Sequence, residues 1–158
     1  MNPVQIINRD LLEMVSSLAK GSPRRRRNYN FHEAESAACH RLLNAIEPDS
    51  YIQPHCHREV IKDETLIVVR GRLGVILFDA HGAVTAMLAL APASESIGVN
   101  IPHGVYHTLV ALEPGSVFFE AKAGPFVPLK PEEKASWAPT EGDTQVDAYL
   151  KKIKQCFA

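Results

Sequence analysis

The stretch ETLIVVRGRLGVILF (residues 64–78) holds two apolar runs, 65–70 and 73–78, on either side of Gly71-Arg72. Short runs of Val, Ile and Leu bounded by Gly are typical of β-strands, and a two-residue connection containing Gly predicts a hairpin turn. We therefore expect two strands here with Gly71-Arg72 as the turn between them.

The same pattern continues on both sides of this stretch. Gly, Pro and Asp interrupt the apolar runs at close intervals, and Ala80-His81-Gly82 predicts a second hairpin turn. Strands are predicted near 28–32, 38–46, 51–57, 64–70, 73–78, 83–90, 96–101, 105–111 and 117–123. Many short strands with no helix between them favour an all-β sandwich or closed barrel.

A helix is predicted at each end of the chain. Apolar residues recur at helical spacing over 8–20 and again from about 144 to 157, which gives each segment one apolar face. The stretch 124–143 is rich in proline and is expected to wrap the barrel as an irregular connection. A chain of 158 residues has the size of one domain, so we expect a single unit over 1–158.

Charge and cysteine content exclude several classes of protein. The formal net charge of −1 disfavours a general nucleic-acid binder, which needs an excess of Lys and Arg. No apolar run approaches the roughly 20 residues needed to span a bilayer, and the first residues do not form a signal peptide. Cys39, Cys56 and Cys156 are odd in number and widely spaced, which favours a reducing cytoplasm over a disulfide framework.

Histidines supply the chemically most distinctive pattern. His55 and His57 flank Cys56 in a predicted strand, where residues i and i+2 point to the same face. Paired imidazoles suit Zn, Fe, Ni, Cu or Mn, although two solvated surface histidines would give the same pattern. Glu64 begins the next strand, and the turn IPHGVYH (101–107) delivers His107 to the start of another.

These residues resemble the two motifs of the cupin family. The first motif is usually written G-x5-H-x-H-x3–4-E-x6-G and the second G-x5-P-x-G-x2-H-x3-N; this chain has H-x-H at 55–57, E-x6-G at 64–71 and P-x-G-x2-H at 102–107. The resemblance implies a double-stranded β-helix, or jelly-roll barrel, over about 28–125. A C-terminal wrap and helix would follow over about 126–158. It also implies one divalent transition metal (Fe, Zn, Mn or Ni), whose ligands would be His55, His57, Glu64 and His107.

The chain departs from these motifs in a few places. The expected motif residues are replaced at Asp49, Ser96 and Ala111. The loop 58–63 is two residues longer than the motif allows, which leaves Glu59 and Asp63 as rivals to Glu64. Glu64 is favoured because its spacing to Gly71 matches the motif.

Two flanking stretches, SPRRRRNYNFH (22–32) and SWAPTEG (136–142), resemble the WbuC family of cupin-fold metalloproteins. Genes of that family typically lie among those for bacterial surface polysaccharide and O-antigen synthesis. This context favours a small polar substrate such as a sugar or nucleotide-sugar. The open positions of the metal would support isomerase or epimerase chemistry, or dioxygenase chemistry if the metal is Fe(II). A non-catalytic sugar-binding or regulatory cupin is the alternative.

The candidate substrate-binding residues follow one another in the chain. Arginine is suited to planar anions, and alternation places the polar side chains after the arginine run on one strand face. These candidates are Arg24, Arg25, Arg26, Arg27, Asn28, Asn30 and His32. If this face looks outward, the run is a solvated loop and a half-exposed strand. His32 and Tyr106 are candidate acids or bases.

A homodimer is expected, because dimers are the commonest oligomers.

Overall fold

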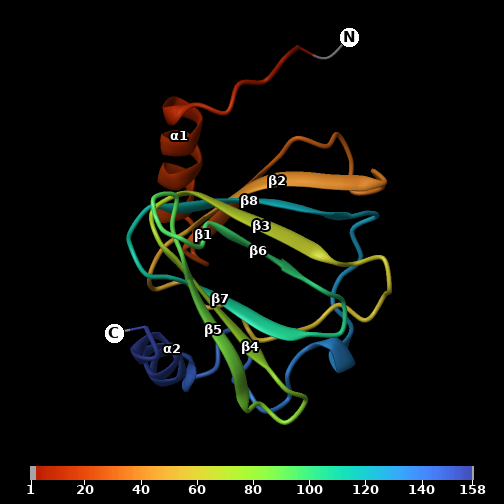
Figure 1. Cartoon of the computed structure of the whole chain (residues 1–158), viewed down its shortest axis with the longest axis vertical. Helices are drawn as coiled ribbons and strands as arrows, with labels where there is room; N and C mark the ends of the chain where they lie inside the picture. The colour runs from red at the N-terminus through yellow and green to blue at the C-terminus, as the bar shows by residue number, and fades with distance from the viewer. Residues whose placement is uncertain (1–2, 158) are drawn as a thin grey trace.

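The computed structural model describes residues 3–157 and shows two β-sheets facing each other, with one helix outside each sheet (Figure 1). The elements are α1 (Arg9–Lys20), β1 (Arg26–Asn30), β2 (Cys39–Ile46), β3 (Glu64–Arg70), β4 (Leu73–Phe78), β5 (Val84–Leu90), β6 (Gly98–Ile101), β7 (Tyr106–Ala111), β8 (Ser116–Ala123), a 3-10 turn (Pro131–Glu133) and α2 (Val146–Gln155). Over residues 3–157, no helix has the length and apolar character to cross a membrane.

The sheets are antiparallel and enclose the main core. One has the order β1-β2-β8-β3-β6 and the other the order β5-β4-β7. Alternate residues of each strand point between the sheets, because successive side chains of a strand face opposite ways. The largest fully buried members of this core are Ile46, Leu66, Leu73, Val75, Leu90 and Ile101. The predicted all-β barrel with a helix at each end is therefore confirmed.

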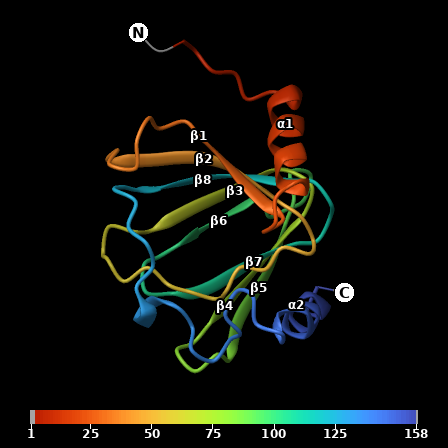
Figure 2. The ribbon, with the colours of Figure 1, turned by 180° about the vertical axis from the view of Figure 1, so that it is seen from behind.

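Each helix covers the outer face of one sheet, as Figures 1 and 2 show from opposite sides. The side chain of Asn8 accepts a hydrogen bond from the backbone N–H of Leu11 and so caps α1. The apolar face of α1 packs Val15 and Ala19 against the larger sheet. The apolar residues of α2 pack on the smaller sheet, where they meet Ile76 and Val110.

Two sequence-based predictions about the strands are wrong. Gly71-Arg72 does not join paired strands: β3 pairs with β6 and β8, whereas β4 pairs with β5 and β7. The turn instead carries the chain from one sheet to the other. The predicted strand 51–57 is an extended segment that pairs only through isolated bridges at His55. Pro54 lacks the N–H that a continuous ladder would need.

The other elements agree with the sequence. The turn at residues 80–82 does connect a paired hairpin, β4 and β5, and Asp79 N–H donates to Ala83 O across it at 2.9 Å. The remaining predicted strands and both helices begin and end within two residues of the observed limits. Local pattern was sufficient for these elements because each forms from one continuous run.

Candidate metal centre

Three imidazoles meet between the two sheets. His55 and His57 lie on the extended segment that precedes β3, and His107 lies on the inward face of β7. One ligand nitrogen from each of these histidines lies within 4.8 Å of the other two. Two backbone hydrogen bonds, from His55 N–H to His107 O (3.0 Å) and from His107 N–H to His55 O (2.9 Å), hold the two segments together.

The backbone also orients two of the rings. The Nδ1 atom of His55 lies 2.9 Å from Gln53 O, and that of His107 lies 2.9 Å from Val105 O. Since a carbonyl can only accept, each Nδ1 must carry the proton, which leaves Nε2 as the free ligand atom. Burial and the neighbouring His107 lower the pKa of His55 to about 3, so this ring is a neutral ligand at pH 7.

Glu64 lies beside this triad. Its carboxylate oxygens are 2.8 Å from His57 Nε2 and 3.2 Å from His107 Nε2. Burial alone would raise the pKa of Glu64, but the close imidazoles of His107 and His57 and the charge of Lys122 outweigh it and hold the pKa well below 4.5. The carboxylate is therefore ionised next to three imidazoles.

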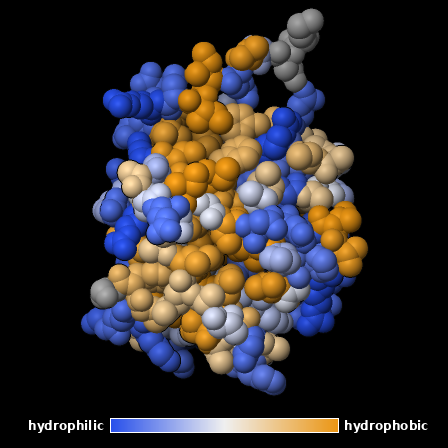
Figure 3. Space-filling model, viewed as in Figure 1, coloured by the Kyte–Doolittle hydropathy of each residue, from blue (hydrophilic) through white to orange (hydrophobic). Residues whose placement is uncertain are grey.

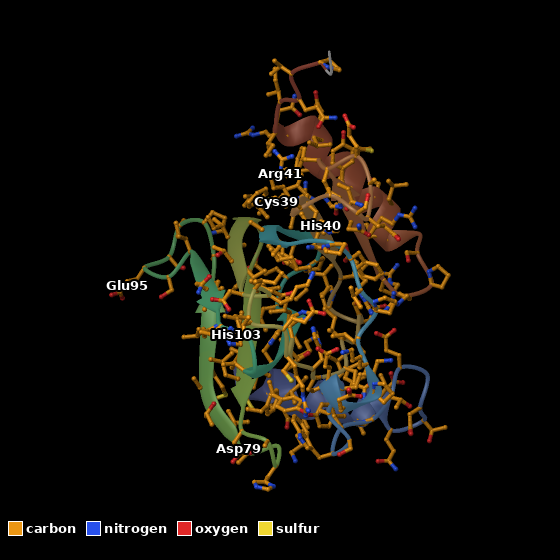
Figure 4. All side chains as sticks on the ribbon, turned by 90° about the vertical axis from the view of Figure 1, so that its right-hand side faces the viewer. Cys39, His40, Arg41, Asp79, Glu95 and His103 are labelled. Carbon is orange, nitrogen blue, oxygen red and sulfur yellow. The ribbon has the colours of Figure 1, made fainter. Side chains whose placement is uncertain are left out.

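The structure does not bring the two rival acidic residues to the triad. Glu59 is exposed in the turn of the 58–63 loop. Asp63 accepts hydrogen bonds from the backbone N–H and Nδ1 of His103, both at 2.8 Å, and these bonds lower its pKa. His103 lies in the turn before β7, where Figure 4 labels it. The extra length of the loop is thus accommodated at the surface.

Lys122 is a site residue that sequence reasoning missed. Its Nζ lies 2.9 Å from Glu64 Oε1 and 2.7 Å from Glu120 Oε1. Asn44 donates to the other oxygen of Glu120 at 2.8 Å. Alternation along 117–123 places Phe118, Glu120 and Lys122 on one face, so the signal was present once that face was known to be inward.

Two cavities open from the triad. The larger, of about 610 Å³, is bounded by His55 and His57 and by the segment 125–129. The smaller, of about 270 Å³, reaches His107 and Glu64. The side chains that border both cavities are Arg24, Arg26, Ile52, His55 and Lys122. A ligand near the imidazoles would therefore also meet cationic side chains.

The arginine run divides between the site and the surface. Arg24 lies 2.9 Å from Glu141 Oε1, and Arg26 pairs with the same oxygen. Arg25 adopts a left-handed backbone (φ 56°) and turns away to Asp49, 2.9 Å distant. Arg27 borders the smaller cavity.

The polar residues of β1 divide in the same way. Asn28 borders the smaller cavity and donates to Asn30 Oδ1 at 2.7 Å. Asn30 and His32 border neither cavity at the triad and lie in a separate hollow below the N-terminal segment. Of the seven predicted substrate-binding residues, the structure thus brings Arg24, Arg26, Arg27 and Asn28 to the site.

The two candidate acid–base residues lie outside both cavities. His32 stacks on His40, with ring centroids 3.9 Å apart. Tyr106 points to the opposite face from His107 and donates its hydroxyl to Glu132 O at 3.2 Å. His40, labelled in Figure 4 at the start of β2, does border the larger cavity. Alternation placed it on the same face as Asn44, which is the inward face.

The donor set fits a transition metal. Three imidazole nitrogens and a carboxylate are ligands for Fe, Zn, Mn or Ni, and no Cys lies among them. The Nε2 of His57 is buried and has no hydrogen-bond partner of suitable geometry among the described residues, despite its closeness to Glu64. A coordinated ion would satisfy this nitrogen.

Comparison with known proteins identifies the fold. The sequence profile of the family described as "Domain of unknown function (DUF6016)" matches residues 7–90, and no curated protein matches the chain. KdgF from Halomonas sp. is similar at a TM-score of 0.52 and 21% identity, covering 67% of this chain and 84% of that one. A cupin superfamily protein (DSY2733) from Desulfitobacterium hafniense is similar at 0.51 and 10%, covering 69% and 86%. These likenesses show that the chain has the cupin fold.

Proposed function

This chain belongs to the DUF6016 family, and we propose that it is a cupin-fold enzyme holding one divalent transition metal on His55, His57, His107 and Glu64. Its substrate is a small anionic sugar or nucleotide-sugar. The observation that carries the proposal is the convergence of three imidazoles within 4.8 Å at the inner end of an open, cation-lined cavity.

The openness of the cavity supports catalysis over a purely structural ion. A cavity of about 610 Å³ falls within the range of small-molecule sites. The bound metal would polarise a carbonyl or hydroxyl for isomerisation or epimerisation, or, as Fe(II), support O₂ chemistry. Arg24 and Arg26 would orient an anionic group, and His40 is a cavity-lining group that could accept or donate a proton.

A role in bacterial surface polysaccharide synthesis rests on the WbuC resemblance. Its two stretches, 22–32 and 136–142, are far apart in the sequence but come together where Arg24 and Arg26 both contact Glu141. This contact borders the larger cavity, so part of each stretch lies at the site. A sugar substrate accords with a role in polysaccharide synthesis.

A non-catalytic sugar-binding or regulatory cupin is the second candidate. The observation that favours it is the ion pair between Lys122 and Glu64. Lys122 holds the Glu64 carboxylate in place beside the imidazoles, as a metal site with a purely structural role would require. Turnover of a bound sugar would exclude this second function.

We also propose a cytoplasmic homodimer. Cys39, Cys56 and Cys156 are all free thiols, which accords with a reducing compartment. Hydrophobic side chains gather over the middle of the face shown in Figure 3, and large apolar residues are exposed on β3 and β5 at Ile67, Val84 and Met87. Light scattering on the purified protein should give twice the chain mass.

Elemental analysis tests the central proposal. The purified wild type should carry close to one metal ion per chain, and a His55→Ala/His57→Ala variant should lose it. His81→Ala, in the exposed turn between β4 and β5, is the matched control and should retain the metal. Full loading of the double variant, or a metal-free wild type after incubation with Fe(II), Zn(II), Mn(II) and Ni(II), would refute the proposal.

A further inference from the structure

Lys62 is a buried lysine in the larger cavity. Only 8% of the residue is exposed, although it belongs to the surface loop 58–63. Its Nζ donates to Ala123 O at 2.8 Å and to Pro125 O at 2.5 Å. These contacts bring the ammonium group to the wall formed by the segment 125–129.

The charge of Lys62 has no counter-charge. Over residues 3–157, no ion pair includes Lys62. The other cations that border this cavity differ: Lys122 pairs with two carboxylates, Arg24 and Arg26 share Glu141, and Lys134 is exposed to water. A buried charge is costly unless it is paired, and two carbonyl oxygens supply only part of what water would give.

The donors of Lys62 are also incompletely used. An ammonium group has three N–H donors, and the two carbonyl oxygens account for two of them. One donor and a full positive charge remain at the cavity. A carboxylate or phosphate oxygen would satisfy both, because a charge-assisted hydrogen bond to an anion is stronger than one to a neutral acceptor.

We propose that Lys62 anchors the anionic group of the substrate. The inference rests on the proposed function and refines it, because it moves the anion site from the arginines to the other side of the cavity. Arg24 is largely exposed and Glu141 already neutralises one of the two arginines, so water and protein satisfy much of their charge. Lys62 has two neutral carbonyl oxygens as partners and no carboxylate.

The rest of the cavity sets the class of substrate. Beside Lys62 the wall is apolar, formed by Pro125, Phe126, Val127, Pro128 and Leu129. The imidazoles of His55 and His57 also border it. A sugar with one oxyanion group matches this arrangement: the anion meets Lys62, the carbon skeleton lies along the apolar wall, and hydroxyl or carbonyl oxygens face the imidazoles.

Calorimetric titration of the metal-loaded protein tests this assignment. The probes are glucuronate, glucose 1-phosphate and neutral glucose, so the first two separate a carboxylate from a phosphate. We expect one anionic sugar to bind the wild type at least tenfold more tightly than glucose. Lys62→Gln, which keeps a donor for the carbonyl oxygens but removes the charge, should abolish that preference, and Lys62→Arg should restore most of it.

Controls separate the anion site from the metal site. Lys151→Gln, at an exposed position of α2, should bind like the wild type. Lys62→Gln should keep the wild-type metal content; if it does not fold, Lys62→Met, which replaces the buried cation by an apolar chain of similar length, takes its place.

Each outcome decides one of the two claims. An unchanged preference for the anion in the Lys62 variant, or the absence of any such preference in the wild type, would overturn the anion site. A wild type that binds the anion through Lys62 but never takes up metal would instead overturn the proposed function and leave the anion site standing.

Discussion

Lys122 lies directly opposite Glu64 in the register of β8 and β3, and its Nζ is 2.9 Å from Glu64 Oε1. The same ammonium group is 2.7 Å from Glu120 Oε1, so one cation separates two inward carboxylates. Burial lowers the pKa of Lys122, but the two carboxylates outweigh this and raise it, which keeps the ammonium charged. The position of the Glu64 carboxylate beside the imidazoles therefore depends on a neighbouring strand.

Replacing Lys122 should destabilise the fold. Lys122→Met leaves Glu64 and Glu120 without their shared cation, and removing one partner of a buried ion pair costs on the order of 3–5 kcal/mol of unfolding free energy. Urea denaturation measures it, with Lys151→Met as the exposed control. Adding Glu120→Gln to Lys122→Met should recover part of the loss. A loss below about 0.5 kcal/mol would mean that the two carboxylates do not need this cation.

Acid should destabilise the metal-free protein through His55. Its pKa is lowered from 6.5 to about 3, so the unfolded chain binds a proton that the folded chain does not. Stability is therefore complete above about pH 6.5 and falls as the pH drops towards 3, by up to about 1.4 kcal/mol per pH unit. Urea titrations in EDTA at several pH values should show a shallower slope for His55→Gln. Parallel curves for the variant and the wild type would contradict this cause.

Gly74 should not tolerate a side chain. A Cβ at this position would lie 2.8 Å from the Phe157 ring and 2.9 Å from Val110 Cγ2, so these side chains would have to shift from their packed positions. Gly74→Ala should cost about 1–3 kcal/mol in thermal or urea unfolding. Gly21→Ala is the matched control, because the nearest atom to its added Cβ is 3.8 Å away. Equal stability of the two variants would show that the Phe157 ring can shift without loss of unfolding free energy.

Removing the charge of Glu141 should strengthen anion binding. Glu141→Gln frees Arg24 and Arg26 from their shared carboxylate and makes the cavity more positive. The affinity for glucose 1-phosphate should rise by roughly two- to fivefold at low salt, and the gain should shrink as salt screens these charges. Glu95→Gln, exposed in the loop before β6 and labelled in Figure 4, should have no effect. A weaker affinity in Glu141→Gln would show that Glu141 positions the arginines for binding.

The sequence was informative wherever a local pattern decides the structure. Alternation along β7 placed His107 on the opposite face from Tyr106, and the cupin resemblance implied that the face of His107 looks inward, as the structure has it. The extended backbone at 55–57 keeps both imidazoles together even without a continuous strand. The spacing from Glu64 to Gly71 likewise selected the carboxylate that the structure brings to the triad.

Contacts between segments that are far apart in the sequence could not be predicted from local patterns. Nothing local distinguishes a turn within one sheet from a turn between two, so Gly71-Arg72 was misassigned. Lys62 lies in a polar loop and is buried only because the carbonyl oxygens of residues 123 and 125 come to meet it. Arg25 and Arg26 are adjacent and chemically identical, and the left-handed backbone at Arg25 directs them to different partners.

The crossing of the chain at Gly71 puts Glu64 and His107 on opposite layers of the barrel. An ion bound by both would act as a cross-link between the layers, much as a disulfide joins the two halves of a sandwich. Metal uptake should therefore slow amide hydrogen exchange in β5, which carries no ligand and does not pair with β7, as well as at the histidines themselves.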